Sequence, residues 1–167
     1  MNGTASDSRP TADRPHMPDY GILPSDQGRG LLPWSWAAER LAAAHNYWFA
    51  TTRPDGRPHL MAVWGVWLQD RFCFSTAGSS VKARNLRHNP RCAVSTESGA
   101  EAVIVEGTAE AVGHGPLRAR IESAYVAKYG EGFPDDSDFM VVRPRVVFAF
   151  IETGEDFVGA ATRWTFA

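Results

Sequence analysis

Segments rich in aromatic, aliphatic and β-branched residues recur along the chain after residue 46, with turn-forming residues between them, which is typical of β-strands. The first is followed by RPDGRP, whose proline and Asp-Gly pair favour a tight turn. The strands predicted in this way are Tyr47–Thr52, His59–Leu68, Arg71–Thr76, Cys92–Thr96, Ala102–Val112, Val141–Thr153 and a final edge strand Thr162–Phe166. Six or so antiparallel strands with few helices predict a mainly β (α+β) fold that closes into a small barrel, since closure removes exposed edges.

Three segments have helical patterns instead. The most distinct begins at Pro116 and ends before Gly130, and it places Leu117, Ile121 and Tyr125 on one face. Shorter helices are predicted for Ser35–His45 and Ser80–His88, and the third runs over Pro116–Tyr129. We therefore expect a few helices at the periphery of the barrel.

The N-terminal part of the chain differs in composition from the rest. Residues 1–18 are polar and rich in proline, so we expect a disordered tail. Residues 19–33 hold apolar side chains among turn formers, which indicates an ordered arm without regular structure. With 167 residues in all, the sequence predicts one domain over 19–167, with the arm as its first part.

Charge and composition narrow the class of function. The formal net charge of −2 argues against a nucleic-acid partner. No apolar stretch is long enough to cross a bilayer and the N-terminus has no apolar signal-peptide core, so we expect a cytoplasmic protein without a membrane partner. Cys73 and Cys92 lie in apolar runs and are expected to be buried thiols. The sequence contains no Cys/His cluster, so a metal site is not expected.

The stretch STAGSSVKARNL at 75–86 carries the main candidate for chemistry. Lys82 follows a run of glycine and hydroxyl residues and lies in the first turn of a predicted helix, where a cation opposes the helix dipole at a cost of about 0.3–1 kcal/mol. A bound phosphate would reverse that balance, because each charge-assisted hydrogen bond contributes about 1.5–3 kcal/mol. The alternative is an ordinary capped loop with a solvated lysine.

Three segments, ATTRPDGRPHLMAVWGVW, FSTAGSSVKARNLRHNPR and VEGTAE, occur in an order and with gaps that resemble the pyridoxamine 5′-phosphate oxidase-like split β-barrels, which include flavin and deazaflavin oxidoreductases. The tail TRWTF is similar to the closing segment of the deazaflavin-using branch. The resemblance implies a six-stranded antiparallel split β-barrel. It also implies a homodimer, with two equivalent cofactor sites at the subunit interface.

The resemblance also implicates particular residues. One strand of the family lies along the cofactor ring, and it matches His59, Met61, Ala62, Val63 and Trp64. Positions near the ribityl chain and the phosphate clamp match Ser75, Thr76, Ser79, Ser80, Val81 and Lys82, with Ser80 at a position that is often arginine in relatives. Arg163 and Trp164 are candidates for a contact with cofactor or substrate, and packing at a sheet edge is the alternative. No side chain is identified as catalytic, because the cofactor would carry the chemistry.

The resemblance favours the deazaflavin coenzyme F420 as cofactor, for hydride transfer to a planar, conjugated small molecule. Flavin mononucleotide (FMN) is the alternative, because both present a phosphorylated ribityl chain. F420 continues into a carboxylate-bearing tail, for which Arg84, Arg87 and Arg91 are candidate contacts; they could equally form a solvated helix face. A module that binds flavin or haem without turnover also stays open, and haem would need an axial histidine.

Four other expectations concern packing. Asn85 is expected to tie its helix to the barrel, and Glu106 to pair with a barrel cation. Gly65 marks either a bulge, a close approach of the cofactor ring or ordinary strand irregularity. Four tryptophans are expected either in the core or lining a substrate pocket: Trp34, Trp36, Trp64 and Trp67.

Overall fold

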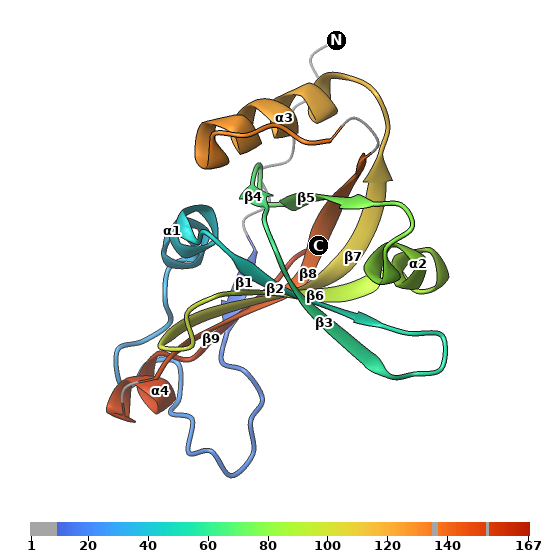
Figure 1. The fold of residues 1–167 in the computed structure, drawn as a ribbon. Coiled ribbons are helices and arrows are strands. Elements are labelled where there is room, and N and C mark those ends of the chain that lie inside the picture. The colour runs from blue at the N-terminus through green and yellow to red at the C-terminus, as the bar shows by residue number, and fades with distance from the viewer. Residues whose placement is uncertain (1–9, 135–136, 153) are drawn as a thin grey trace.

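The fold is an antiparallel sheet that curves round a main hydrophobic core, with a smaller second apolar cluster and with helices at its periphery (Figure 1). A computed structural model describes residues 10–134, 137–152 and 154–167. Its strands are β1 (Thr11–Asp13), β2 (Tyr47–Thr52), β3 (Pro58–Val63), β4 (Val66–Trp67), β5 (Phe72–Ala77), β6 (Arg91–Thr96), β7 (Glu101–Val112), β8 (Ser137–Ile151) and β9 (Thr162–Thr165). Its helices are α1 (Trp34–Ala43), α2 (Val81–His88), α3 (Pro116–Tyr129) and α4 (Gly154–Ala160). The predicted mainly β fold is confirmed.

The long strand β8 joins the two parts of the barrel. Neighbouring strands follow the order β1-β9-β8-β7-β6-β2-β3, and β8 also pairs with β5, which in turn pairs with β4. A bulge between Glu106 and Gly107 shifts the β7–β8 register, and a Cβ at Gly107 would lie 2.2 Å from the Arg143 carbonyl oxygen. Glycine is therefore required where the two longest strands approach most closely.

The alternation of side chains along the strands produces the core. Tyr47, Phe49, Phe72 and Phe74 are fully buried and their rings pack against one another, with ring centroids of Phe49 and Phe74 4.6 Å apart. On β7, Val103 and Val105 are buried between more exposed neighbours. The period of two that predicted the strands is thus the period of burial.

Several boundaries differ from the predictions. The described part of the chain has nine strands rather than six or so: the expected long strand His59–Leu68 is broken into β3 and β4, and β1 was not predicted. Strand β8 begins earlier than expected, at Ser137, and α4 was not predicted. The prediction of disorder over 1–18 is wrong for β1, which pairs with β9; residues 1–9 lie outside the described residues.

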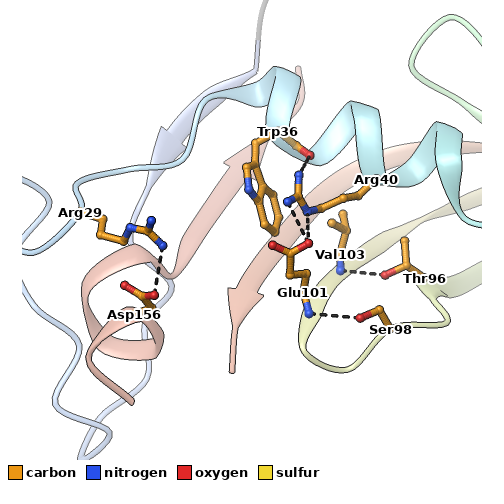
Figure 2. A network of polar contacts seen from close by, with 8 residues as sticks. All are labelled: Arg29, Trp36, Arg40, Thr96, Ser98, Glu101, Val103 and Asp156. Carbon is orange, nitrogen blue, oxygen red and sulfur yellow. Dashed lines mark hydrogen bonds and ion pairs between the residues drawn. The ribbon is translucent and has the colours of Figure 1, made fainter. Parts of the chain in front are cut away.

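Long-range polar contacts account for the ordered N-terminal segments. The Arg14 guanidinium donates to the carbonyl oxygens of Gly159 at 3.0 Å and Ala161 at 2.8 Å, and to two carbonyls of the arm. Arg29 of the arm pairs with Asp156 of α4 at 3.0 Å (Figure 2). Contacts between residues more than 100 positions apart cannot be read from local composition, so the arm and α4 order each other.

Helix α1 is attached to the sheet by another ion pair. The Arg40 guanidinium lies 2.8 Å from a Glu101 carboxylate oxygen at the start of β7, and it also covers the Trp36 ring at 3.6 Å from the centroid (Figure 2). Trp36 is therefore packed under a cation on α1. Of the helices in the described residues, none is both long and apolar enough to span a membrane.

Candidate functional site

The first turn of α2 is built directly after β5. Ser80 has an extended backbone (φ −64°, ψ 157°), and its hydroxyl accepts from the Ala83 amide at 3.1 Å, so Ser80 is the N-cap of α2. The same hydroxyl lies 2.9 Å from Thr76 Oγ1, which links the cap to the end of β5. Gly78 permits the tight turn, since a Cβ there would lie 2.7 Å from an Asp138 carboxylate oxygen. Strand, turn and cap thus place Lys82 in the first helical turn, as predicted.

Lys82 belongs to a group of positive charges. Its side chain is half-buried and forms no ion pair with any described residue, and burial lowers its pKa. Burial first, and then the nearby charges of Arg53 and Lys82, lower the pKa of His59. We call the two cations Arg53 and Lys82, together with His59, whose imidazole they help to keep neutral, the cation cluster. No carboxylate of the described residues forms a salt bridge with the cluster, although the charge of Arg53, after the hydrogen bonds from Arg57, helps to lower the pKa of Asp55. Around Lys82 the electrostatic potential therefore favours an anion.

Helix α2 is fixed to the β2–β3 hairpin by a buried hydrogen bond. Asn85 is 2% exposed and donates through Nδ2 to Thr51 Oγ1 at 2.9 Å, which confirms its expected structural role. Thr51 stands opposite His59 in the strand register, and its Oγ1 lies 3.5 Å from His59 Nδ1. The Asn85–Thr51 bond therefore holds the residues of the cation cluster on α2 and on β3 in a fixed relation.

Strand β3, the predicted ring strand, is an edge of the sheet. Within the described residues it pairs with β2 alone, so one row of its backbone N–H and C=O groups has no strand partner. Met61 and Trp64 are 46% and 41% exposed, Ala62 is exposed, and Val63 is buried. An edge strand beside α2 offers both backbone hydrogen bonds and apolar side chains to a flat ligand.

The structure brings only some of the predicted contact residues together. Those at the junction of β5 and α2 are adjacent along the chain and surround the cap: Ser75, Thr76, Ser79, Ser80, Val81 and Lys82. Ser79 is exposed, whereas Ser75 and Val81 are half-buried. His59 reaches this group from β3, while the rest of the ring strand follows at Met61–Trp64. The clamp and the ring strand therefore border one region.

The C-terminal candidates lie elsewhere. Trp164 is 1% exposed and its ring packs edge-on against Trp34 with centroids 5.4 Å apart, so the prediction that it contacts cofactor or substrate is wrong. The reason is alternation on β9, where Trp164 points into the core opposite Val147. Arg163, its neighbour, points to the other face opposite Phe148 and Asp13, and its role remains a prediction. Trp34 also contacts Trp67, so both indoles pack at the core.

The arginines proposed for the coenzyme tail have different surroundings. Arg84 is exposed and forms no ion pair in the described residues, whereas Arg87 pairs with Asp138 at 3.3 Å. Arg91 lines a cavity of about 540 Å³ together with Glu106 and Arg145. Glu106 forms no ion pair with a described residue, so its expected pairing is not observed.

That cavity lies apart from the cation cluster. None of Arg53, His59 and Lys82 lines it, although Thr51, which contacts Asn85 and His59, does. The full lining is Ala50, Thr51, Thr52, Pro58, Arg91, Cys92, Ala93, Glu106, Gly107, Thr108 and Arg145. Of the three tail candidates, only Arg91 borders it.

Cysteine and metal chemistry contribute nothing visible to the site. Cys73 and Cys92 are buried as expected, and burial raises the pKa of each thiol to about 12, which keeps them protonated. No group of three or more metal-ligating side chains occurs in the part of the chain that the structure describes.

The sequence analysis did not include Arg53 among the candidate site residues, because RPDGRP indicated only a turn.

Comparison with known proteins identifies the family. The family model described as pyridoxamine 5′-phosphate oxidase matches residues 37–153, and the chain belongs to this family of split barrels. Comparison with curated proteins gives no match.

Solved structures similar to this chain have different reported roles. An F420 reductase is 27% identical with a TM-score of 0.54, over 65% of this chain and 93% of that chain. The conserved hypothetical protein Rv2991 from Mycobacterium tuberculosis is 24% identical with a TM-score of 0.63, over 72% and 87%. A haem-binding protein from Mycobacterium smegmatis is 20% identical with a TM-score of 0.61, over 77% and 61%. The last two likenesses show the fold alone.

The cation cluster predicts a measurable histidine titration. In the free protein the pKa of His59 should lie below 6.5, and in Lys82→Met it should rise, because one of the two nearby positive charges is removed. Histidine ring signals in a pH series of NMR spectra measure both values. Arg84→Met, which removes a cation from the same helix, is the control and should leave the pKa of His59 in place. An unchanged pKa in Lys82→Met would show that the cluster is not electrostatically coupled.

Proposed function

We propose that this protein is an F420-dependent oxidoreductase that transfers hydride between the deazaflavin coenzyme and a planar, conjugated small molecule. The observation that carries the proposal is the cation cluster beside the Ser80-capped start of α2, in which Lys82 forms no salt bridge with a described residue. Family membership supports it, because the chain shares its barrel with flavin-binding proteins, and an F420 reductase is among its structural neighbours. The named activity itself is our proposal.

The residues fit a phosphorylated ribityl chain. The backbone N–H groups of the first turn of α2 and the helix dipole favour an anion at this position. Lys82 would supply a charged donor, and Ser79 an exposed hydroxyl. Ser80 is engaged as the cap, and relatives often carry arginine at its position; here Arg53 brings a further positive charge from the β2–β3 hairpin.

The ring would lie along the edge of β3. The unpaired backbone groups of this strand can hydrogen-bond the polar edge of a tricyclic ring, while Met61 and Trp64 offer apolar surface. The coenzyme supplies the hydride chemistry when bound, and the chain's residues bind it, orient it and cover part of it. Arg84 would then face the carboxylates of the coenzyme tail, whereas Arg91 lines the separate cavity.

Two alternatives make different use of the same surface. FMN would contact the phosphate clamp and the ring strand, but it has no carboxylate-bearing tail for the tail arginines to bind. A haem-binding module is favoured by two structural neighbours, the Mycobacterium smegmatis haem-binding protein and the haem storage protein HutZ from Vibrio cholerae. His59 would then be the candidate axial ligand, since its lowered pKa keeps the imidazole neutral. A Soret band in the visible spectrum would identify that case.

We also propose a homodimer. The strand register places Trp48, Leu60, Ile104 and Phe148 on the outer face of the sheet, where Trp48 is 47% and Leu60 57% exposed. An apolar band across several strands favours burial against a second copy. The cofactor sites would then lie at the interface, as the family resemblance implies.

The proposed clamp predicts a selective loss of cofactor affinity. Lys82→Ala should weaken F420 binding about ten- to a hundredfold, corresponding to one charge-assisted hydrogen bond of about 1.5–3 kcal/mol, with the fold intact. Fluorescence titration with F420 and with FMN measures both affinities. Arg120→Ala is the matched control, because Arg120 is an exposed arginine on α3.

The same titration also tests the choice of F420 over FMN. F420 should bind at micromolar concentration or tighter and more tightly than FMN, and its binding should weaken with salt, because exposed charges are screened within about 8–10 Å at physiological ionic strength. Tight FMN binding without F420 binding would contradict the choice of F420. Unchanged affinity in Lys82→Ala would instead contradict the clamp.

The proposed dimer predicts the mass in solution. Light scattering should report a species of twice 18.3 kDa at micromolar concentration, and Leu60→Glu should convert it to monomer by burying a charge at the interface. Val126→Glu on α3, where the valine is 48% exposed, is the control and should remain dimeric. A wild-type monomer at this concentration would rule the dimer out.

A further inference from the structure

The break between β3 and β4 is held by the C-terminal end of α3. Strand β3 pairs with β2 and β4 pairs with β5, so the chain crosses between the two parts of the barrel at Trp64 and Gly65. Both backbone polar groups of Gly65 are bound by this helix. The Gly65 amide donates to Tyr129 Oη at 3.0 Å, and the Gly65 carbonyl oxygen lies 2.8 Å from Tyr129 Oη and 2.9 Å from Lys128 Nζ.

The number of available hydrogens shows why both Tyr129 and Lys128 are needed to satisfy the backbone of Gly65. The Tyr129 hydroxyl has one hydrogen but faces two carbonyl oxygens, of His45 and of Gly65, each at 2.8 Å. When it donates to His45, only Lys128 donates to Gly65. Lys128 is anchored in turn by Tyr47, whose Oη accepts from Nζ at 2.8 Å and donates to the Leu41 carbonyl. The ammonium therefore connects α3, β2 and the strand break.

Gly65 is also confined from the side of β5. A Cβ at this position would lie 2.4 Å from Phe72 Cζ and 2.9 Å from the Cys73 carbonyl oxygen. The close approach expected at Gly65 is thus an approach to β5. With β5 on one side and the two α3 side chains on the other, the path of the chain at the break is fixed.

The same tyrosine fixes the last residue of the predicted ring strand. The Trp64 indole stacks on the Tyr129 ring, with centroids 4.7 Å apart and planes 4° apart, and its Nε1 donates to Asn46 Oδ1 at 3.1 Å. The indole also contacts the rings of His45 and Tyr125, and Trp64 remains 41% exposed. The position of Tyr129 therefore decides how the indole is presented beside β3.

We propose that Lys128 and Tyr129 are positioning residues of the cofactor site: by binding both backbone groups of Gly65, they set the end of β3 and the plane of Trp64 against which the ring lies. This inference rests on the proposed function, since it assumes that the ring strand binds a ring. Lys128 and Tyr129 act through Gly65 and Trp64, and do not themselves touch the cofactor.

The surroundings of Lys128 make its contribution dependent on pH. The groups that face it are Tyr47 from β2, Tyr129 from its own helix and Glu97 after β6, while His45 packs on the Tyr129 ring. Burial lowers the pKa of Lys128 to about 8, and the negative charge of Glu97 only partly opposes this. Above that pH the neutral amine is a weaker donor to Gly65.

With rising pH, the free energy of unfolding is expected to change in the opposite direction to the cofactor affinity. The unfolded chain keeps the Lys128 proton up to its ordinary pKa of 10.5, whereas the folded chain loses it near 8. The unfolded state therefore binds more protons between these values, and the free energy of unfolding should rise with pH there. Cofactor affinity should fall over the same range, which a loss of general stability would not produce.

The experiment compares Lys128→Met and Tyr129→Phe with the wild type. Each variant should bind F420 about tenfold more weakly, the loss expected for one hydrogen bond to a charged or buried group, with an unchanged circular dichroism spectrum. The fall in affinity above pH 8 should be present in the wild type and absent in Lys128→Met. In the free protein, the Trp64 emission, obtained by difference from Trp64→Phe in each background, should shift in both variants. Arg120→Met, an exposed position on α3, should change none of these.

The outcomes separate this inference from the function on which it rests. If the wild type binds F420 and both variants bind it equally well, the positioning role is wrong and the proposed function stands. If the wild type binds FMN but not F420, the choice of F420 fails, and the affinities of the two variants for FMN test the positioning role. If the wild type binds neither cofactor, the proposed function fails, and the cofactor role of Lys128 and Tyr129 fails with it. An unshifted Trp64 emission in both variants would show that the two side chains do not set the strand break, whatever the cofactor.

Discussion

The candidate site depends on one constraint, the break of the second strand at Trp64 and Gly65. If the strand continued straight, its two halves would remain in one ladder and β3 would not be left as an edge. The break is enforced by sterics, since no side chain fits at Gly65 against Phe72, and by the α3 side chains that bind its backbone. An edge strand with unpaired backbone groups, lying beside the capped start of α2, is the direct result.

Electrostatics distinguishes this region from an ordinary sheet edge. Lys82 opposes the dipole of α2 at a cost of up to about 1 kcal/mol, and its partial burial also disfavours its charged form. A phosphate would more than offset this, since each charge-assisted hydrogen bond contributes about 1.5–3 kcal/mol. The barrel hosts several functions, among them those of an F420 reductase and of haem-binding proteins, so the functional argument rests on the cluster and not on the fold.

Local sequence signals predicted the parts of the structure that local interactions determine. The proline and glycine at the ends of α3, the capped start of α2 and the alternating strands are of this kind. An irregularity at Gly65 was among the alternatives expected from the sequence, but a break of the strand was not predicted, because the apolar run continues through it and only packing against Phe72 and α3 reveals it. Strand β1 and α4 depend on Arg14, whose carbonyl partners are far away in the sequence.

The site residues divide in the same way, into those that local sequence signals indicate and those that depend on long-range packing. The motif proposed Lys82 and the serines as contacts, which stays a prediction, and Asn85 was assigned correctly to packing. Trp164 was misplaced because adjacent residues of a strand face opposite sides, so Arg163 and Trp164 could not both reach one site. Arg53 and Lys128 were missed, since each acquires its role only when hairpin and helix are brought to the edge of β3.

The most direct test of the phosphate clamp compares ligands that differ only there. FMN and riboflavin share the ring and the ribityl chain, so the ratio of their dissociation constants isolates the phosphate. Our account predicts that FMN binds at least about tenfold more tightly than riboflavin, and that the ratio falls toward one in Lys82→Ala. Equal affinities for the two ligands in the wild type would contradict it.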